Sequence, residues 1–525
     1  MAKRAPKRPS QRRFDLAPQV GISRSTFDLS FPLKTAFDSG LLIPTPPIEV
    51  LPGDSFRLRM SSLVRLATPI HPTMDNLHLE TFWFFVPNRL VWENWQKFMG
   101  EQDNPSDSTD FQLPSRQLTG GPDGINTLQD YFGLPVVGHT GTFRANDLPF
   151  RGYNLCFNEW FKDQNLQDAA VVDKGDGAST LGNYVLRRRG KRKNYITSAL
   201  PWPQKGPGVE IPIGATAPIV FQGAENDRIR AANTTANQDG WEWGGTNVGT
   251  NAFATQVSPA GGNLVADLAA ATGATINDWR EAFQLQKLQE RDARGGTRYT
   301  EILKSHFQVT SPDSRLQRPE LLATGSSPIQ MNTVPQTSET AQGSQTPQGN
   351  LAAYAQGIQT NHGFTKSFVE HGYILGMINV RADLTFQKRL DRHWSRETKY
   401  DFYWPALQAL GEQAVLQREV FTDGTAQDNT VWGYQERWAE YRQIMGTITG
   451  QFRSQAATTL DPWHYALDFG NTPPALNATF IEDNPPVKRT IAVTDQPEFI
   501  MDAWLDIKAA RPMPTYSVPG YIDHF

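Results

Sequence analysis

The sequence contains one cysteine, Cys156, among 525 residues. A single thiol cannot close an intrachain disulfide or build a cysteine-based zinc site, so both are excluded. The scarcity of cysteine also fits synthesis in a reducing cytoplasm. No signature of a catalytic nucleophile surrounds Cys156, and we therefore expect a buried structural thiol at this position.

Long apolar runs and known catalytic motifs are absent as well. Because no run of 18 or more apolar residues occurs, we expect no helix that crosses a bilayer, and the N-terminal MAKRAPKRPSQRR lacks the apolar core of a secretory signal. The chain has no GxGxxG, GxxxxGKS/T or GxSxG, and its nine histidines never fall at HxH or HxxxH spacing. We predict no catalytic residue, no cofactor and no metal ligand, although a metal site assembled from distant residues stays open.

The abundant residues favour a loop-rich β protein. Gly and Pro number 42 and 37, which together is about 15% of the chain. Hydrophobic residues make up 38% and aromatic residues 11%, which suits a large core or large interfaces. The length allows two or three average domains, or one large β domain with insertions.

The formal net charge of −4 conceals two basic segments, residues 1–13 and 187–193, that contain no acidic residue. Outside them, 38 Lys and Arg face 54 Asp and Glu, which leaves −16. Charge concentrated in this way predicts a polyanionic partner. The proline-punctuated segment 1–24 is expected to be an extended arm that either neutralises nucleic-acid phosphates or is simply solvated. The predicted DNA contacts are Lys3, Arg4, Lys7, Arg8, Arg12, Arg13, Arg187, Arg188, Arg189, Lys191, Arg192 and Lys193.

Aromatic residues concentrate in a strand followed by a helix between 76 and 102. The stretch from Leu77 to Val86 alternates at first and then becomes an apolar run, which predicts a strand covered on both faces at one end. Pro87 should end the strand, since it cannot donate to a sheet ladder. Asn88 is then placed to cap a short helix, whose buried face carries Val91, Trp95 and Phe98.

The clearest period-two pattern runs from Phe56 to Leu66, with apolar residues on one face of a strand. The other face carries Arg57, Arg59 and Arg65. These arginines either pair with acids across the sheet or face DNA, and the sequence leaves both alternatives open. Further strands are predicted at 371–384 and 499–507, while 311–362 is expected to be a long connection rich in Ser, Thr, Gln and Pro.

Two longer helices are predicted. The first covers 147–162, with Asp147 as its cap and its aromatic residues on one face. The second covers 275–294, where Thr275 and Asp278 resemble a capping box. The buried side of this second helix is expected to carry Ile276, Trp279, Phe283 and Leu288.

Residues 203–274 are rich in Gly, Ala, Asn and Thr and have few large apolar side chains. Such a stretch cannot form an independent core, so we expect an insertion that gains order from identical copies, or a flexible surface loop without a role. Within it, Trp241, Trp243 and Phe253 are best able to bury area. The proline-rich segments 25–50 and 511–525 are expected to lie across neighbouring subunits.

Four separate stretches resemble one known family, the major capsid protein of gokushoviruses, which are small single-stranded-DNA phages of the microvirus group. They are MDNLHLETFWFFVPNRLVWENWQKF at 74–98, LPWPQKG at 200–206, QLQKLQERDARGGTRYTEILKSHF at 284–307 and TPQGNLAAY at 346–354. The resemblance extends over most of the chain, from about residue 24 to its last residue.

The resemblance implies a mainly β chain, with a single eight-stranded viral jelly roll that carries long inserted loops and several short helices. A basic arm at 1–24 would precede two jelly-roll parts, 25–202 and 275–525, separated by a variable insertion at 203–274. Sixty copies would form a small T=1 icosahedral shell around circular single-stranded DNA. The shell would assemble in the cytoplasm of the host bacterium and belong to the virion.

The same resemblance implies further partners. The insertion would form protrusions at the threefold axes, where Trp241, Trp243 and Phe253 contact symmetry mates or a receptor on the host surface. A small basic DNA-binding protein, a pilot protein and an internal scaffolding protein of the virus would accompany the shell. No membrane insertion is implied, and the chain would not be an enzyme.

One alternative comes from another class of protein. A secreted-type β-sandwich that binds or cleaves glycans could use the 14 Trp and the many acids to line a sugar cleft. The missing secretory signal and the two basic segments argue against it. Particle size in solution separates the two, since a shell sediments as a megadalton object and a glycan enzyme does not.

Overall fold

A computed structural model describes residues 23–108, 110–119, 124–137, 141–209, 219–221, 264–266, 276–294, 305, 317–337 and 349–516. Two compact units divide the chain: Met1–Pro203 with Ser311–Phe525 forms the first, and Gln204–Thr310 forms the second. The six predicted contacts of the arm, from Lys3 to Arg13, lie outside the described residues, as do Trp241, Trp243 and Phe253.

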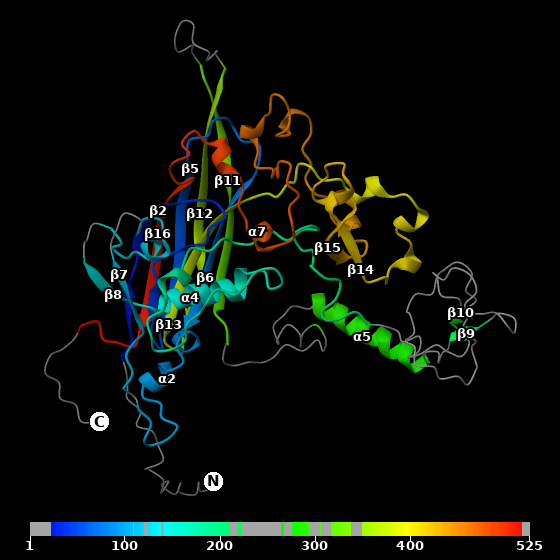
Figure 1. The fold of residues 1–525 in the computed structure, drawn as a ribbon. Helices are drawn as coiled ribbons and strands as arrows, with labels where there is room; N and C mark the ends of the chain where they lie inside the picture. The colour runs from blue at the N-terminus through cyan, green and yellow to red at the C-terminus, as the bar shows by residue number, and fades with distance from the viewer. Residues whose placement is uncertain are drawn as a thin grey trace, which may run out of the picture. The chain divides into compact units, whose positions relative to one another are not determined.

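The first unit is built on one antiparallel sheet of ten strands (Figure 1). They are β1 Ser25–Asp28, β2 Phe31–Phe37, β3 Ile43–Pro44, β4 Ile48–Val50, β5 Ser55–Leu66, β6 Leu77–Pro87, β11 Glu320–Pro335, β12 Leu351–Ser367, β13 Gly372–Ala382 and β16 Phe499–Arg511. The order across the sheet is β1-β16-β5-β12-β11-β6-β13-β3, with β2 beside β1 on β16 and β4 beside β3 on β13. The path therefore has eight strand positions, and this curled sheet confirms the predicted mainly β, jelly-roll class.

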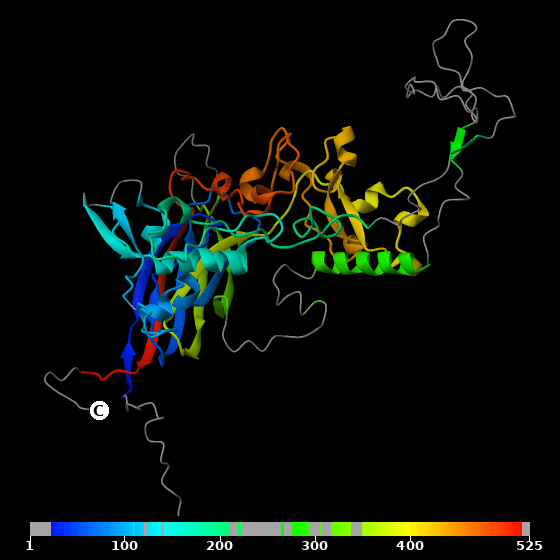
Figure 2. The same cartoon turned by 60° about the horizontal axis from the view of Figure 1, so that its bottom comes forward.

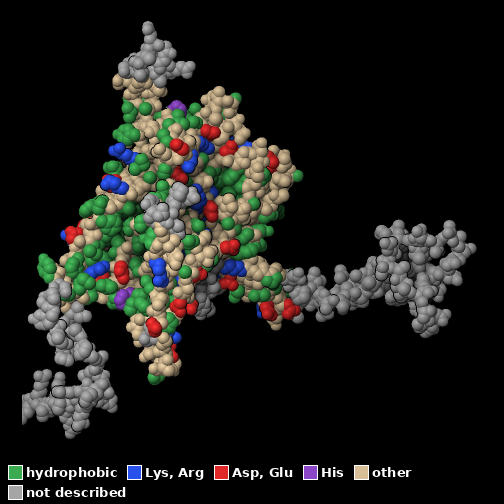
Figure 3. Space-filling model, turned by 60° about the vertical axis from the view of Figure 1, so that its left-hand side comes forward, with side chains coloured by type: hydrophobic (Ala, Val, Ile, Leu, Met, Phe, Trp, Pro, Cys, Tyr) green, Lys and Arg blue, Asp and Glu red, His purple; other side chains and the backbone are tan. Residues whose placement is uncertain are grey.

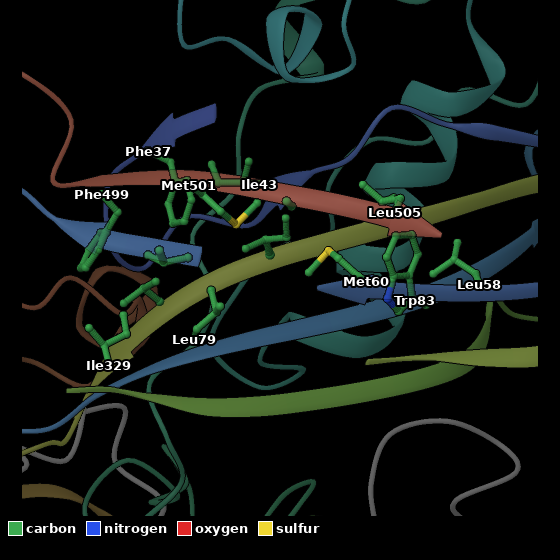
Figure 4. Packing of buried hydrophobic residues seen from close by; sticks show 14 of the residues in the cluster. Phe37, Ile43, Leu58, Met60, Leu79, Trp83, Ile329, Phe499, Met501 and Leu505 are labelled. Carbon is green, nitrogen blue, oxygen red and sulfur yellow. The ribbon is translucent and has the colours of Figure 1, made fainter. Parts of the chain in front are cut away.

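The core lies on the concave side of this sheet (Figure 4). In β5 every second side chain from Phe56 to Leu66 is buried, and β16 repeats the pattern from Phe499 to Ala509. Both predicted strands are confirmed, because alternation places all apolar side chains of each strand on one face. Figure 4 shows residues such as Met60, Trp83 and Met501 pointing into the shared interior from β5, β6 and β16.

Strand β6 is covered on both faces at its aromatic end, as predicted. Trp83 and Phe85 belong to the main core, whereas Phe84 and Val86 pack into a second cluster on the opposite face. That second face is covered by α4 Leu148–Cys156, which continues as a π-helical turn at Phe157–Phe161 (Figure 2). The predicted helix 147–162 is confirmed by these two elements.

The short helix expected after Pro87 is divided into two, α1 Asn88–Val91 and α2 Trp95–Phe98. The break falls at Trp92, whose backbone is extended and whose indole Nε1 donates to Asp176 Oδ1 at 2.6 Å. Asn88 is the first residue of α1 and makes no side-chain cap, which corrects the predicted capping role.

The expected long connection at 311–362 is wrong, because it contains most of the two longest strands, β11 and β12. Small residues let these strands approach their neighbours closely. A Cβ on Gly363 would lie 1.8 Å from the carbonyl oxygen of Leu58, and one on Gly325 would overlap the ring of His362. The sheet here is held by backbone pairing and close approach rather than by large apolar side chains, so hydrophobic periodicity is weak.

The remaining part of the first unit consists of short elements, and some of them, such as β14, β15 and α7, surround a third buried cluster. The pairs are β7 Ser115–Thr119 with β8 Thr142–Asn146 and β14 Glu412–Leu416 with β15 Val431–Glu436. The short helices are α3 Leu128–Tyr131, η4 Leu181–Asn183, η6 Arg392–Ser395, η7 Lys399–Asp401, η8 Pro405–Leu407, η9 Gln417–Glu419, η10 Ala426–Asn429, η11 Ala439–Tyr441, η12 Gly450–Phe452, η13 Asp461–Trp463, α7 Ala478–Ile481 and η14 Val487–Thr490.

The second unit contains α5 Ile276–Arg294 and an antiparallel pair, β9 Ile219–Phe221 with β10 Leu264–Ala266. The predicted helix is confirmed, but its predicted buried side is not. Trp279, Phe283 and Leu288 are exposed, because no described element of this unit packs over them. None of the described helices is long and apolar enough to cross a membrane.

Candidate nucleic-acid interface and assembly surface

The basic run 187–193 is held as an extended segment between two other parts of the chain. The amide of Arg189 donates to the carbonyl of Gly40 at 2.9 Å, and that of Lys191 donates to the carbonyl of Ile481 at 2.6 Å. Arg188 and Gly190 form isolated β-bridges with Leu41 and Glu482. These backbone contacts position the six cations of the run, which Gly190 divides into two groups of three, relative to β6 and β13.

Glu80 on β6 is the main counter-charge for this run. Its carboxylate pairs with Arg189, with Arg192 at 3.2 Å and with Arg381 of β13 at 3.6 Å. Burial alone would raise the pKa of Glu80, but the three arginines outweigh burial and lower it. Glu80 is therefore ionised at neutral pH and neutralises part of the run.

Lys191 is buried, and its Nζ donates to the carbonyls of Phe480 and, at 2.6 Å, Glu482. Burial lowers its pKa to about 8. Arg187 and Arg188 donate in the same way to backbone carbonyls, Arg187 to that of Asn183 at 2.9 Å. These three cations bind backbone carbonyls of the fold, and Lys191 is buried while Arg187 and Arg188 are half-buried.

The other end of the run is accessible. Arg192 pairs with Asp383 at 3.0 Å and is about one-third exposed, and Lys193 pairs with Asp163 while 54% of its side chain is exposed. Of the six predicted contacts in this run, these two are therefore best placed to reach a ligand. The role of the run in binding DNA stays a prediction.

An open cavity of about 360 Å³ lies along this end of the run. It is lined by cations and aromatic rings: Trp160, Phe161, Lys162, Asp163, Arg189, Gly190, Lys191, Arg192, Lys193, Arg381 and Ile481. The guanidinium of Arg189 lies over the ring of Phe161 at 5.6 Å. Cations beside aromatic faces suit phosphates and stacked bases.

Sequence reasoning missed several residues that line this cavity or pair with the basic run. Arg381 and Glu80 lie on buried strands, where a charged residue within an apolar pattern is the signal that it is paired. Trp160 and Lys162 end a helix whose aromatic face was assigned to the core. Asp383 follows β13 directly and gave no signal of its own.

The described residues contain no group of three or more His, Cys, Asp or Glu that could hold a metal ion. Cys156 is fully buried, as predicted, and burial raises the pKa of its thiol well above the ordinary value. A thiol that stays protonated and buried is a poor nucleophile.

A second surface stands out by its exposed aromatic side chains. Tyr403 packs against Tyr441 at 6.4 Å, and the guanidinium of Arg396 lies over Phe402 and Tyr441 at 5.2 and 4.4 Å, so these rings form one patch. Exposed apolar patches of this kind mark interaction surfaces. We call it the aromatic surface, and its residues are Tyr400, Phe402, Tyr403, Trp404, Tyr441 and Ile444.

Comparisons with known proteins agree on one family. A family model described as capsid protein (F protein) matches residues 17–521. The chain is 45% identical over 539 aligned positions to capsid protein VP1 of Bdellovibrio phage phiMH2K, covering 99% of each chain. It is 40% identical to capsid protein VP1 of Chlamydia phage 1 over 97% of each chain, and 35% identical to that of Spiroplasma virus 4 over 95% of each chain.

Proposed function

We propose that sixty copies of this chain assemble into a T=1 icosahedral shell around circular single-stranded DNA. The premise is that the chain belongs to the capsid protein (F protein) family and is a major capsid protein of the virion. The near full-length match to three phage capsid proteins is the observation that carries this proposal. A family with this description has a structural role, and we propose that the chain is not an enzyme.

The aromatic surface supports assembly. Six large side chains are exposed there, among them Ile444 with 95% of its surface accessible. A stable contact between proteins buries about 800 Å² on each partner, and its centre is enriched in aromatic residues. A shell offers each subunit several such contacts, so this surface is suited to a neighbouring copy.

The basic residues support the enclosure of nucleic acid. The cavity beside Arg192 and Lys193 combines cations with aromatic rings, and residues 1–13 of the arm add six cations. Contacts of this kind bind the DNA backbone without reading sequence, and they weaken as salt rises. Because the chain as a whole is acidic, a separate small basic DNA-binding protein is also expected inside the shell.

The finer partners follow from the same proposal. A pilot protein and an internal scaffolding protein would accompany assembly in the bacterial cytoplasm. Residues 203–274 would contact a host receptor at the threefold axes, with Trp241, Trp243 and Phe253 at that surface.

Nuclease protection tests the proposal. The chain would be expressed in bacteria with its viral partners, and particles would be purified and treated with nuclease before their nucleic acid is extracted. We expect closed particles that protect circular single-stranded DNA. Particles without DNA, or protein that stays monomeric under these conditions, would show the proposal to be wrong.

A further inference from the structure

The outer face of the sheet formed by β5, β16, β12, β1 and β2 carries a second set of basic and apolar residues. In β5 the residues between the buried positions are Arg57, Arg59, Ser61, Leu63 and Arg65, and all three arginines are exposed. These are the arginines for which the sequence left two alternatives open, namely pairing with acids across the sheet or contact with DNA.

Strand register places more cations on this face. Arg57 lies opposite Lys508 of β16, which lies opposite Asp28 of β1. Arg59 lies opposite Asp506. Lys34 of β2 lies opposite Asp502, which in turn lies opposite Leu63. Cross-strand partners point to the same side of a sheet, so the face carries five cations against three carboxylates.

Within the described part of the chain, Arg57, Arg59 and Arg65 form no ion pair within 4.0 Å of a carboxylate, so cross-strand pairing does not neutralise them. By contrast, Arg189, Arg192 and Lys193 of the run at 187–193 pair with Glu80, Asp383 and Asp163. Unpaired arginines in a row keep their full attraction for an anionic ligand.

The same face exposes large apolar side chains among the cations. Trp504 is 51% exposed, and Ile358 and Ile500 are each 61% exposed. By register Trp504 lies opposite Ser61, between Arg59 and Arg65 along β5. Figure 3, in which the β2 and β16 side of Figure 1 comes forward, shows Lys and Arg side chains among hydrophobic ones on this face.

We propose that this outer sheet face is a binding site for single-stranded DNA, with Arg57, Arg59 and Arg65 on phosphates and Trp504 stacking on a base. Alternate residues of a strand are about 7 Å apart, so Arg57 and Arg59 address neighbouring points of an extended backbone. An exposed aromatic ring between cations is the arrangement by which proteins hold single strands without reading their sequence. The inference rests on the proposed function, which supplies the DNA.

Charge favours DNA over a second copy of the chain as the occupant of this face. The face is net positive by two charges among the eight named, whereas a contact between copies would have to desolvate three unpaired arginines. The basic arm also joins the fold here, since only eleven residues separate Arg13 from Ser25, and Ser25 lies opposite Arg511 at the Arg57 end of β16.

The test compares two triple variants that each remove three exposed arginines. The first is Arg57→Gln, Arg59→Gln and Arg65→Gln. The second, as a matched control elsewhere in the same unit, is Arg144→Gln, Arg442→Gln and Arg453→Gln. Binding of the full-length subunit to a 20-nucleotide poly-dT strand is measured at several salt concentrations, together with the DNA protected in assembled shells.

We expect the first variant to reduce the slope of log binding constant against log salt by about 2, since each phosphate contact on a single strand contributes about 0.7. The control should leave the slope unchanged, and Arg→Lys at the same three positions should largely restore it. Shells of the first variant should protect less DNA, and Trp504→Leu should reduce the quenching of tryptophan fluorescence by poly-dT.

Three results would overturn the inference. They are an unchanged slope in the first variant, an equal loss in the control, and a folded first variant that forms no shells, which would make this face a contact between copies. Wild-type shells that hold no DNA would instead refute the proposed function itself, so the two failures are distinguishable.

Discussion

Asp147 is the position where one substitution should damage the fold most. It lies at the start of α4 but makes no side-chain cap, contrary to the sequence prediction. Its carboxylate instead pairs with Arg116 and with Arg151 at 2.8 Å and accepts a hydrogen bond from Ser179, and all three ionic side chains are at most 1% exposed. Removing a partner from a buried ion pair costs about 3–5 kcal/mol, because an uncompensated charge stays buried.

We therefore predict that Asp147→Asn lowers the free energy of unfolding of the unassembled subunit by about 3–5 kcal/mol, a large part of the 5–15 kcal/mol typical of a domain. Urea unfolding followed by tryptophan fluorescence measures the loss. Glu436→Gln is the control, since Glu436 pairs with Arg442 where both side chains are at least 40% exposed, and it should cost less than about 1 kcal/mol.

A double variant sharpens this test. Outside its pairing with Asp147, Arg116 lies over the rings of Phe150 and Tyr184 at 3.9 and 4.5 Å. Adding Arg116→Met to Asp147→Asn should therefore recover about 1–3 kcal/mol, because one of the two unpaired cations is gone. A loss for Asp147→Asn no larger than that of the control, or strict additivity in the double variant, would refute the reasoning.

Three further predictions concern the basic run and the aromatic surface. Lys191 has a pKa of about 8 in the folded chain against an ordinary 10.5, so between these pH values the unfolded chain binds more protons and the free energy of unfolding of the wild type should rise with pH. Lys191→Met should lose this rise when urea unfolding is measured at pH 7.5, 9 and 10.5. Parallel pH profiles of the two proteins would contradict the prediction. Glu80→Gln removes the shared counter-charge of the cavity, so poly-dT should stay bound to higher salt, and an unchanged salt midpoint would count against the cavity as a DNA contact. Phe402→Ser with Ile444→Ser should give a folded subunit that forms no shells, whereas Val369→Ser, which is exposed elsewhere, should assemble normally; shells from the double variant would remove the aromatic surface from assembly.

Local pattern predicted the parts of the fold in which one strand face is apolar. The strands at 56–66 and 499–507, and the two-sided burial of β6, were all foreseeable, because period-two alternation and its loss directly report which faces are covered. The helix at 147–162 was foreseeable for the same reason with a period of 3.6.

Other features depend on contacts that no local pattern encodes. β11 and β12 are rich in Gly, Ser and Thr, and they are strands because β5 and β6 supply pairing partners distant in sequence. The cap assigned to Asp147 failed because Arg116, 31 residues away, takes its carboxylate. Likewise, the run at 187–193 showed its charge in the sequence but not Glu80, Asp163 and Asp383, which neutralise much of it.

For helix α5 the sequence predicted the bounds correctly but the burial incorrectly. Its length was predicted to within one residue, yet the apolar side chains assigned to its buried side are exposed in the single chain. Periodicity identifies an apolar face but does not say whether the same chain covers it. For a protein that assembles, such a face is a candidate for contact with other copies.

The mass of the assembled particle tests the central claim most directly. Sixty copies of a 58.7 kDa chain give a protein shell of about 3.5 MDa, closed by icosahedral symmetry. Charge-detection mass spectrometry of purified particles, before and after their DNA is released, would measure both the shell and its contents. The account predicts a single protein mass near this value with added DNA. A monomer, a small oligomer or a broad series of open assemblies would contradict it.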